Sequence, residues 1–158
     1  MNERARRSNG RSKNVLQTAA VVLFRDGHVL AVRNGAGTTL GEGVRSLPGG
    51  RANNGESDLE TAQREFEEET GLRAKRLVEY PGNYFFVDKM RINGGVVPAS
   101  FRVFLCTDYE GEVRPEPSGE TVPEWIPLKD FHFLHHTGPN QGAAVFNAQR
   151  HLEERTND

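Results

Sequence analysis

Two apolar stretches near the start of the chain, separated by a turn signal, predict a β-hairpin. Residues 16–24 read LQTAAVVLF and residues 28–33 read HVLAVR, so both runs suit buried strands. Asp26 and Gly27 stand between them, and this pair favours the tight turn of a hairpin. Residues 34–45 are rich in glycine and predict a loop.

The clearest helical pattern lies between Ser57 and Gly71. Ser57 or Asp58 is expected to cap the N-terminus, and Gly71 is expected to follow the last turn. Glu60 stands three residues after Ser57, which is the spacing of a capping box. At about 100° per residue, one apolar stripe is expected to contain Leu59, Ala62 and Phe66.

The second half of the chain predicts further strands and a final helix. Apolar runs indicate short strands at 76–80, 84–87, 101–107 and 125–126. Gly94 and Gly95 mark a turn, and residues 110–124 form a loop rich in proline, glycine and acidic residues. Residues 140–154 predict a helix. Strands interleaved with helices in this way indicate an α/β fold, with a mixed sheet covered by helices.

Length and composition limit the classes of protein that fit. A chain of 158 residues corresponds to one domain, and 35% hydrophobic with 27% charged residues is typical of globular proteins. The single cysteine, Cys106, excludes an intramolecular disulfide framework and suits a reducing compartment. No apolar run approaches the roughly 20 residues of a membrane span, and no secretory signal is visible. We therefore expect a cytoplasmic protein without a membrane partner.

The net charge of −2 conceals a basic start and an acidic body. Residues 1–14 carry four arginines and Lys13 against the single acid Glu3, so the rest of the chain is acidic. We interpret 1–14 as a disordered tail and 15–158 as the folded domain. Contact of the tail with nucleic acid or a membrane surface is the alternative. An acidic body argues against a stable nucleic-acid partner.

The predicted helix carries an acidic face. Glu65, Glu68 and Glu69 fall at i, i+3 and i+4, where like charges repel by a few tenths of a kcal/mol per pair. Bound cations would offset this repulsion, and carboxylates suit Mg²⁺, Mn²⁺ or Ca²⁺ better than Zn²⁺. Arg64 stands four residues before Glu68 and can hold one of its oxygens. A solvated acidic helix face is the alternative interpretation.

A longer pattern surrounds these acids and resembles the signature of the Nudix hydrolase family. Its members, at the family's spacing, are Gly50, Glu56, Arg64, Glu65, Phe66, Glu68, Glu69, Gly71 and Leu72. The preceding Leu47-Pro48-Gly49 is also similar to the family. Phe66 departs mildly, because relatives more often carry an aliphatic residue there. The resemblance extends over residues 16–154.

The resemblance implies an α/β/α sandwich with a mixed sheet and a loop–helix–loop catalytic motif. It implies hydrolysis of a nucleoside diphosphate linked to another moiety, with Mg²⁺ or alternatively Mn²⁺ as cofactor. By motif position, Glu65, Glu68 and Glu69 are metal ligands, together with a backbone carbonyl of Gly49 or Gly50. Glu68 and Glu69 also carry the catalysis, and Glu56 and Arg64 orient the loop and the carboxylates.

Three residues outside the signature are candidates for substrate binding. Arg33 ends the second apolar run and can bind phosphate, or it is a surface charge. Arg45 stands where relatives often carry an aromatic residue, and its role is open. Asn140 opens the last predicted helix, where some relatives place a base-reading asparagine. An amide can read a purine edge, but asparagine is also a favoured helix cap.

A further acid outside the helix is expected to assist the reaction. Carboxylates bound to a metal are poor bases, because the metal lowers their pKa. Glu120 lies in the loop 110–124, five residues before Trp125, near an offset where some relatives place a mobile acid. Glu116 and Glu124 are rivals in the same loop.

The substrate class is the least specified property. A proline at the position of Asp88 would suggest ADP-ribose, and a tyrosine at Lys89 or Met90 would suggest dinucleoside polyphosphates. Their absence favours a nucleoside triphosphate or related small-molecule nucleotide. The alternatives are cleavage of ADP-ribose or a nucleotide sugar, and a nucleotide-sensing module without turnover. A homodimer is also left open.

Overall fold

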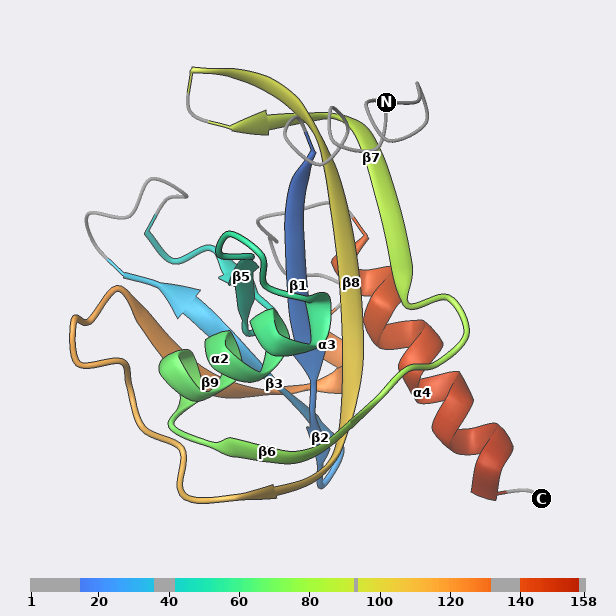
Figure 1. Ribbon diagram of the computed structural model, residues 1–158. Coiled ribbons are helices and arrows are strands. Elements are labelled where there is room, and N and C mark those ends of the chain that lie inside the picture. Colours follow the sequence, from blue (N-terminus) through green and yellow to red (C-terminus); the bar gives the residue numbers. More distant parts are fainter. Residues whose placement is uncertain (1–14, 36–41, 93, 132–139, 157–158) are drawn as a thin grey trace.

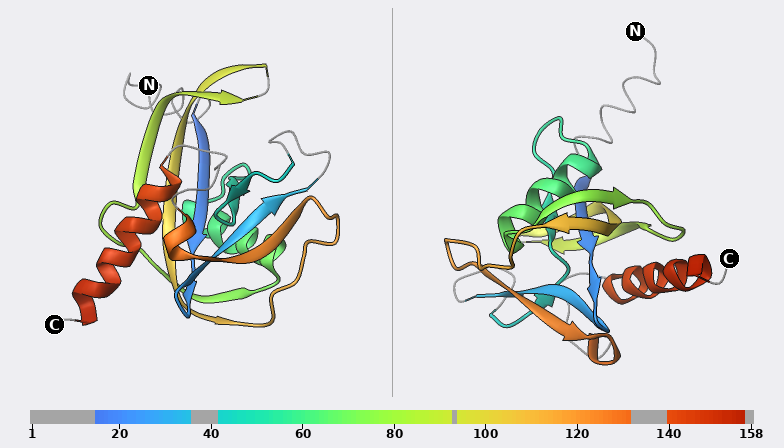
Figure 2. Two further views of the ribbon diagram at one scale, coloured as in Figure 1. Left: turned by 180° about the vertical axis from the view of Figure 1, so that it is seen from behind. Right: turned by 90° about the horizontal axis from the view of Figure 1, so that it is seen from below.

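The computed structural model describes residues 15–35, 42–92, 94–131 and 140–156. The predicted tail, residues 1–14, lies outside the described residues. Within them the strands form two sheets, and the two longer helices lie on either side of the larger one (Figures 1 and 2). None of the described helices combines the length and hydropathy that a membrane span requires.

The larger sheet has five strands in mixed orientation. β1 pairs in parallel with β8 and antiparallel with β5, and β8 pairs antiparallel with β6 and β7. The strands are β1 (Leu16–Val22), β5 (Gly49–Arg51), β6 (Arg73–Val78), β7 (Tyr84–Ile92) and β8 (Gly95–Glu110).

The smaller sheet has four antiparallel strands centred on β3. β3 pairs with β9 along one edge and with β2 and β4 along the other. The strands are β2 (Phe24–Arg25), β3 (His28–Asn34), β4 (Arg45–Ser46) and β9 (Thr121–Pro127). Among the described residues, the helices are α2 (Asp58–Thr70), α3 (Leu128–Phe131) and α4 (Gln141–Thr156).

β1 is buried on both faces and separates two hydrophobic clusters. Ala19 and Val21 pack in the cluster of α2 with Phe66, and Ala20 and Val22 pack in the cluster of α4. Successive side chains of a strand point to opposite faces, so one apolar run serves both helices. The predicted α/β/α arrangement with a mixed sheet is confirmed.

The predicted boundaries of α2 are confirmed by its caps. The Ser57 hydroxyl accepts from the Glu60 N–H at 3.1 Å, and the Glu60 carboxylate accepts from the Ser57 N–H at 3.0 Å. Gly71 follows in the left-handed conformation with φ 79°. The predicted stripe is wrong at Leu59, which is exposed, because burial along α2 begins only at Thr61.

The predicted hairpin between residues 16–24 and 28–33 is wrong for most of its length. The Asp26-Gly27 turn joins only the two-residue strand β2 to β3, while β1 belongs to the other sheet. Both runs are apolar on both faces, which suits central strands of separate sheets better than the two arms of a hairpin.

Several other strands differ from their predicted bounds. β8 and β9 extend well beyond the apolar cores from which they were predicted, because neighbouring strands supply partners for their polar ends. β6 begins and ends earlier than 76–80. β4, β5 and α3 were not predicted, since they are too short for a periodic pattern. The turn at Gly94 is confirmed, with φ 78°.

Candidate active site

The acidic face of α2 lies against the Gly49-Gly50 strand β5. The Gly49 N–H donates to Oε1 of Glu69 at 2.8 Å. A Cβ placed on Gly50 would stand 2.7 Å from the carboxyl carbon of Glu65. The absence of a side chain at Gly50 therefore allows the Glu65 carboxylate to approach the backbone of β5, and the Glu69 carboxylate approaches it by accepting the Gly49 N–H.

Glu56 and Arg64 form a two-pronged ion pair beside these carboxylates. Arg64 Nε and Nη2 donate to the two oxygens of Glu56 at 2.8 and 2.9 Å, and Nη2 also donates to the carbonyl of Arg51. The Asn53 N–H and the Thr61 hydroxyl also donate to Glu56. These hydrogen bonds, that of Arg64 above all, lower the pKa of Glu56 to about 2.

Arg64 also donates hydrogen bonds to the acidic face of α2. The sequence predicted one such partner, and the structure shows two. Its Nη1 donates to Glu65 at 2.8 Å and to Glu68, the predicted partner, at 3.3 Å. Hydrogen bonding to Glu56 and Glu65 raises the pKa of Arg64, so it remains a cation. One guanidinium, locked by Glu56, thus faces two carboxylates that would otherwise repel each other.

Burial distinguishes the three acids of the helix face. Burial raises the pKa of Glu69 to about 8, and the neighbouring charges of Glu65, Glu116 and Glu68 add to this effect. Burial likewise raises the pKa of Glu65, against the hydrogen bond from Arg64. The Glu68 side chain is half exposed. The surroundings of Glu69 disfavour the negative charge of its carboxylate, and a cation bound at this face would offset that effect.

The donor set of this face suits a hard divalent cation. Carboxylate and backbone carbonyl oxygens are the ligands that Mg²⁺ and Mn²⁺ prefer. Among the described residues, no group of three His, Cys, Asp or Glu side chains already surrounds a single point. Instead, Oε1 of Glu65 accepts from Arg64 and Oε1 of Glu69 accepts from the Gly49 N–H.

The three candidate loop acids occupy different surroundings. Glu116 is half-buried, accepts from the Thr121 hydroxyl at 3.2 Å and adds to the raised pKa of both Glu65 and Glu69. The Glu120 side chain is exposed, and its backbone carbonyl accepts from the Gly35 N–H at 2.7 Å. Glu124 lies within β9 and forms ion pairs with Arg33 and Arg45.

The start of α4 is hydrogen-bonded to the segment between β4 and β5. Gln141, which sequence reasoning did not single out, is buried, and its Oε1 accepts from the Leu47 N–H at 2.8 Å. Nothing in the local pattern distinguishes it from a surface glutamine. Asn140 is exposed with φ 72°, outside the usual conformation of a helix cap. Among the described residues its side chain makes no hydrogen bond.

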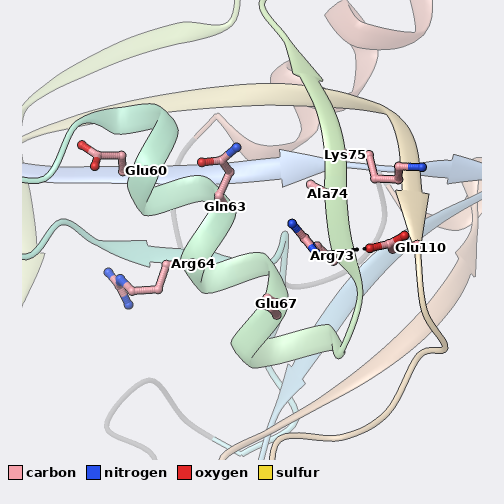
Figure 3. Close-up of a pocket in the computed structure, with 8 residues that line it drawn as sticks. All are labelled: Glu60, Gln63, Arg64, Glu67, Arg73, Ala74, Lys75 and Glu110. Carbon is pink, nitrogen blue, oxygen red and sulfur yellow. Dashed lines mark hydrogen bonds and ion pairs between the residues drawn. The ribbon is translucent and has the colours of Figure 1, made fainter.

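A hollow of about 710 Å³ lies on the opposite face of α2, between this helix and β6. Figure 3 shows its walls, which mix acidic and basic side chains and include the Arg73–Glu110 ion pair. Of the acidic-face residues, Arg64 reaches its rim, but Glu65, Glu68 and Glu69 do not line it. The hollow is therefore separate from the carboxylates that suit a metal.

Comparison with known proteins places this arrangement in a family. A profile of the NUDIX domain matches residues 15–149. No curated protein sequence matches the chain. Among solved structures, the NUDIX domain of Shewanella oneidensis NrtR, determined with ADP ribose, is similar with a TM-score of 0.70 and 20% identity. That similarity covers 96% of this chain and 99% of the other.

Two further structures share the fold at low identity. A MutT NUDIX hydrolase from Burkholderia pseudomallei has a TM-score of 0.65 and 21% identity, covering 84% of this chain and 96% of its own. A C. elegans Ap4A hydrolase has a TM-score of 0.65 and 15% identity, covering 89% and 99%. At these identities the similarities concern the fold.

Replacement by alanine is expected to have different effects at Gly49 and at Gly50, on stability at the first and on metal binding at the second. Gly49→Ala should lower the melting temperature strongly, because its Cβ would lie 2.7 Å from the Cα of Ala20 in β1. Gly50→Ala should keep the fold, because the three atoms nearest to its Cβ all belong to the flexible end of the Glu65 side chain, but should weaken Mn²⁺ binding. Thermal melts and calorimetric Mn²⁺ titrations check both. Unchanged Mn²⁺ affinity in Gly50→Ala would contradict the placement of Glu65.

The raised pKa of Glu69 predicts a pH-dependent stability without metal. Between the ordinary pKa of 4.5 and about 8, the folded protein keeps a proton that the unfolded chain has released. This contribution is therefore complete below pH 4.5 and is lost as pH rises through 8. Metal-free melting temperatures should fall from pH 5 to 8, and Glu69→Gln should flatten the fall. Glu67→Gln, on the opposite helix face, is the control that should retain the wild-type slope.

Proposed function

The chain belongs to the Nudix hydrolase family, and from this premise we propose that it hydrolyses a pyrophosphate bond in a nucleoside triphosphate or a related nucleotide, with Mg²⁺ as cofactor. The observation that carries the proposal is the face of α2. Glu65 and Glu69 lie against the backbone of Gly49 and Gly50, and an arginine locked by Glu56 donates hydrogen bonds to Glu65 and Glu68. A solvated acidic face would need neither the close approach of Glu65 to Gly50 nor the locked arginine.

In this proposal Glu65, Glu68 and Glu69 hold the metal, together with a backbone carbonyl of Gly49 or Gly50. Bound Mg²⁺ would polarise the phosphoryl group and lower the pKa of a water molecule. Glu56 keeps the Arg64 guanidinium in place, and Arg64 sets the positions of Glu65 and Glu68 before the cation arrives. This pre-organisation reduces the reorganisation that binding would otherwise require.

We assign Glu120 the role of the base that accepts a proton from the attacking water. Glu120 lies in the loop before β9 and its side chain is exposed, so in this proposal a movement of that loop would bring it to the substrate, which a helix residue cannot do. Glu116 is the rival, because its charge already acts on Glu65 and Glu69. Glu124 is a weaker rival, because two arginines hold it within β9.

The substrate is proposed to contact Arg33, Arg45 and Asn140. The two arginines lie directly opposite each other on β3 and β4 and would bind phosphate oxygens. The exposed Asn140 amide would read the base from the start of α4, which Gln141 ties to the Leu47 backbone. The lone buried thiol of Cys106, whose pKa burial raises to about 11, suits the cytoplasm that we propose as its location.

A second candidate substrate is ADP-ribose. The NrtR domain, which shares the fold over most of both chains, was determined with ADP ribose. A nucleotide sugar would be handled in the same way, because it presents the same diphosphate. A sensing role without turnover is the remaining alternative, and the complete set of glutamates in α2 argues against it.

Replacing a helix carboxylate should separate turnover from folding. Purified protein with Mg²⁺ should hydrolyse one member of a panel of nucleoside triphosphates, ADP-ribose, nucleotide sugars and dinucleoside polyphosphates. Glu68→Gln and Glu69→Gln should each lower its turnover by roughly 10²–10⁴-fold, the scale of losing a metal-activating or acid–base group. Glu67→Gln on the opposite face should retain activity. Near-normal turnover in both helix variants would contradict the assignment.

The two loop acids can be compared directly. Glu120→Gln should lower kcat by roughly 10–10³-fold with little change in KM, because the proton moves only in the chemical step. Glu116→Gln is the matched comparison in the same loop and should have the smaller effect on kcat. The reverse ranking would move the role to Glu116. Full activity in both variants would place the base on α2.

A further inference from the structure

Three charged side chains, Arg33, Arg45 and Glu124, form a cluster on the smaller sheet. Arg33 on β3 lies directly opposite Arg45 on β4, and Glu124 lies on β9 along the other edge of β3. Glu124 pairs in register with Ala31, so it shares a face with Arg33 two positions further along. This is the face that packs toward α4, because Ala31 belongs to the α4 cluster.

One carboxylate divides its oxygens between the two guanidiniums. Oε1 of Glu124 accepts a hydrogen bond from Nε of Arg45, which reaches across the central strand. Oε2 faces Nε of Arg33 at 3.8 Å. Like charges directly opposite each other on a sheet are unfavourable. Glu124 offsets this repulsion but leaves the cluster with an excess positive charge.

Both ion pairs use Nε, and this leaves the outer nitrogens of the arginines available. Arg45 Nη1 makes a long contact of 3.5 Å to the Gly43 carbonyl. Among the described residues, Nη2 of Arg45 and both Nη groups of Arg33 donate no hydrogen bond. The three side chains are only 29–39% exposed, so their positions are restricted. A guanidinium held at Nε presents its Nη groups as a fork that matches an oxyanion.

We infer that Glu124 is a positioning residue that holds Arg33 and Arg45 as a paired clamp for an oxyanion group of the ligand, distinct from the group held at α2. The inference rests on the proposed function for the identity of the ligand as a nucleotide, whose phosphate chain supplies such groups. Glu124 does not touch the ligand. It acts by aligning the two arginines, which bind the anion together.

The experiment measures anion binding without metal, so that it is independent of catalysis. Tripolyphosphate is titrated into the full chain in EDTA at low ionic strength, where charge interactions are least screened. Wild-type protein should bind it, and Arg33→Ala and Arg45→Ala should each weaken binding roughly tenfold or more, as expected for charged hydrogen bonds. If the wild-type protein binds tripolyphosphate but hydrolyses no nucleotide with Mg²⁺, the proposed function is contradicted and the inference about the arginines is not.

Glu124→Asp is the decisive variant, because it keeps the charge but is too short to hold both guanidiniums. It should weaken tripolyphosphate binding by roughly threefold to tenfold. In an Arg33→Ala/Arg45→Ala background it should have no further effect. Glu110→Asp is the matched control, since Glu110 also pairs with an arginine on a strand, Arg73, away from the cluster. Circular dichroism confirms folding of each variant.

Three results would overturn the inference. Tighter binding by Glu124→Asp would show that Glu124 competes with the anion instead of positioning its ligands. An effect that persists without both arginines would show that Glu124 acts elsewhere. Absence of tripolyphosphate binding to the wild-type protein would show that the arginines form no anion site of their own.

Discussion

The ion pair between Arg64 and Glu56 is the interaction on which the candidate active site depends. Three carboxylates on one face of α2 repel each other, and burial makes the charges of Glu65 and Glu69 still less favourable. The guanidinium of Arg64 offsets this repulsion from within the same helix. Without Glu56 and the Arg51 carbonyl to fix it, Arg64 would be a mobile surface cation. The loop before α2 thus fixes Arg64, and Arg64 in turn stabilises the charges of Glu65 and Glu68.

The arrangement of the sheets explains how a small protein supports such a face. β1 supplies apolar side chains to both helices, and the two glycines of β5 pair with it in register. Because Gly50 has no side chain, Glu65 of α2 can lie close to the backbone of β5 while Phe66 anchors the helix in the core. A rigid sheet on one side and a capped helix on the other leave little freedom for Glu65 and Glu69.

Charge is separated between the two faces that serve the proposed reaction. The acidic face of α2 requires a cation before an anionic substrate can approach it. The arginines of the smaller sheet carry excess positive charge and need none. A ligand with several phosphates would thus meet two kinds of site, one formed with a metal and one formed by the protein alone. Glu124 aligns the two arginines of the smaller sheet, just as Arg64 positions the carboxylates of α2.

The sequence by itself determined α2 with its caps, the family, the α/β class and the acidic face, because these depend on local spacing and on residue type. It did not determine that β1 and β3 belong to different sheets, since an apolar run does not specify its partner strand. Nor did it reveal the buried Gln141 or the pairing of Glu124 with two arginines. Those contacts join residues far apart in the chain, and only the tertiary structure brings them together.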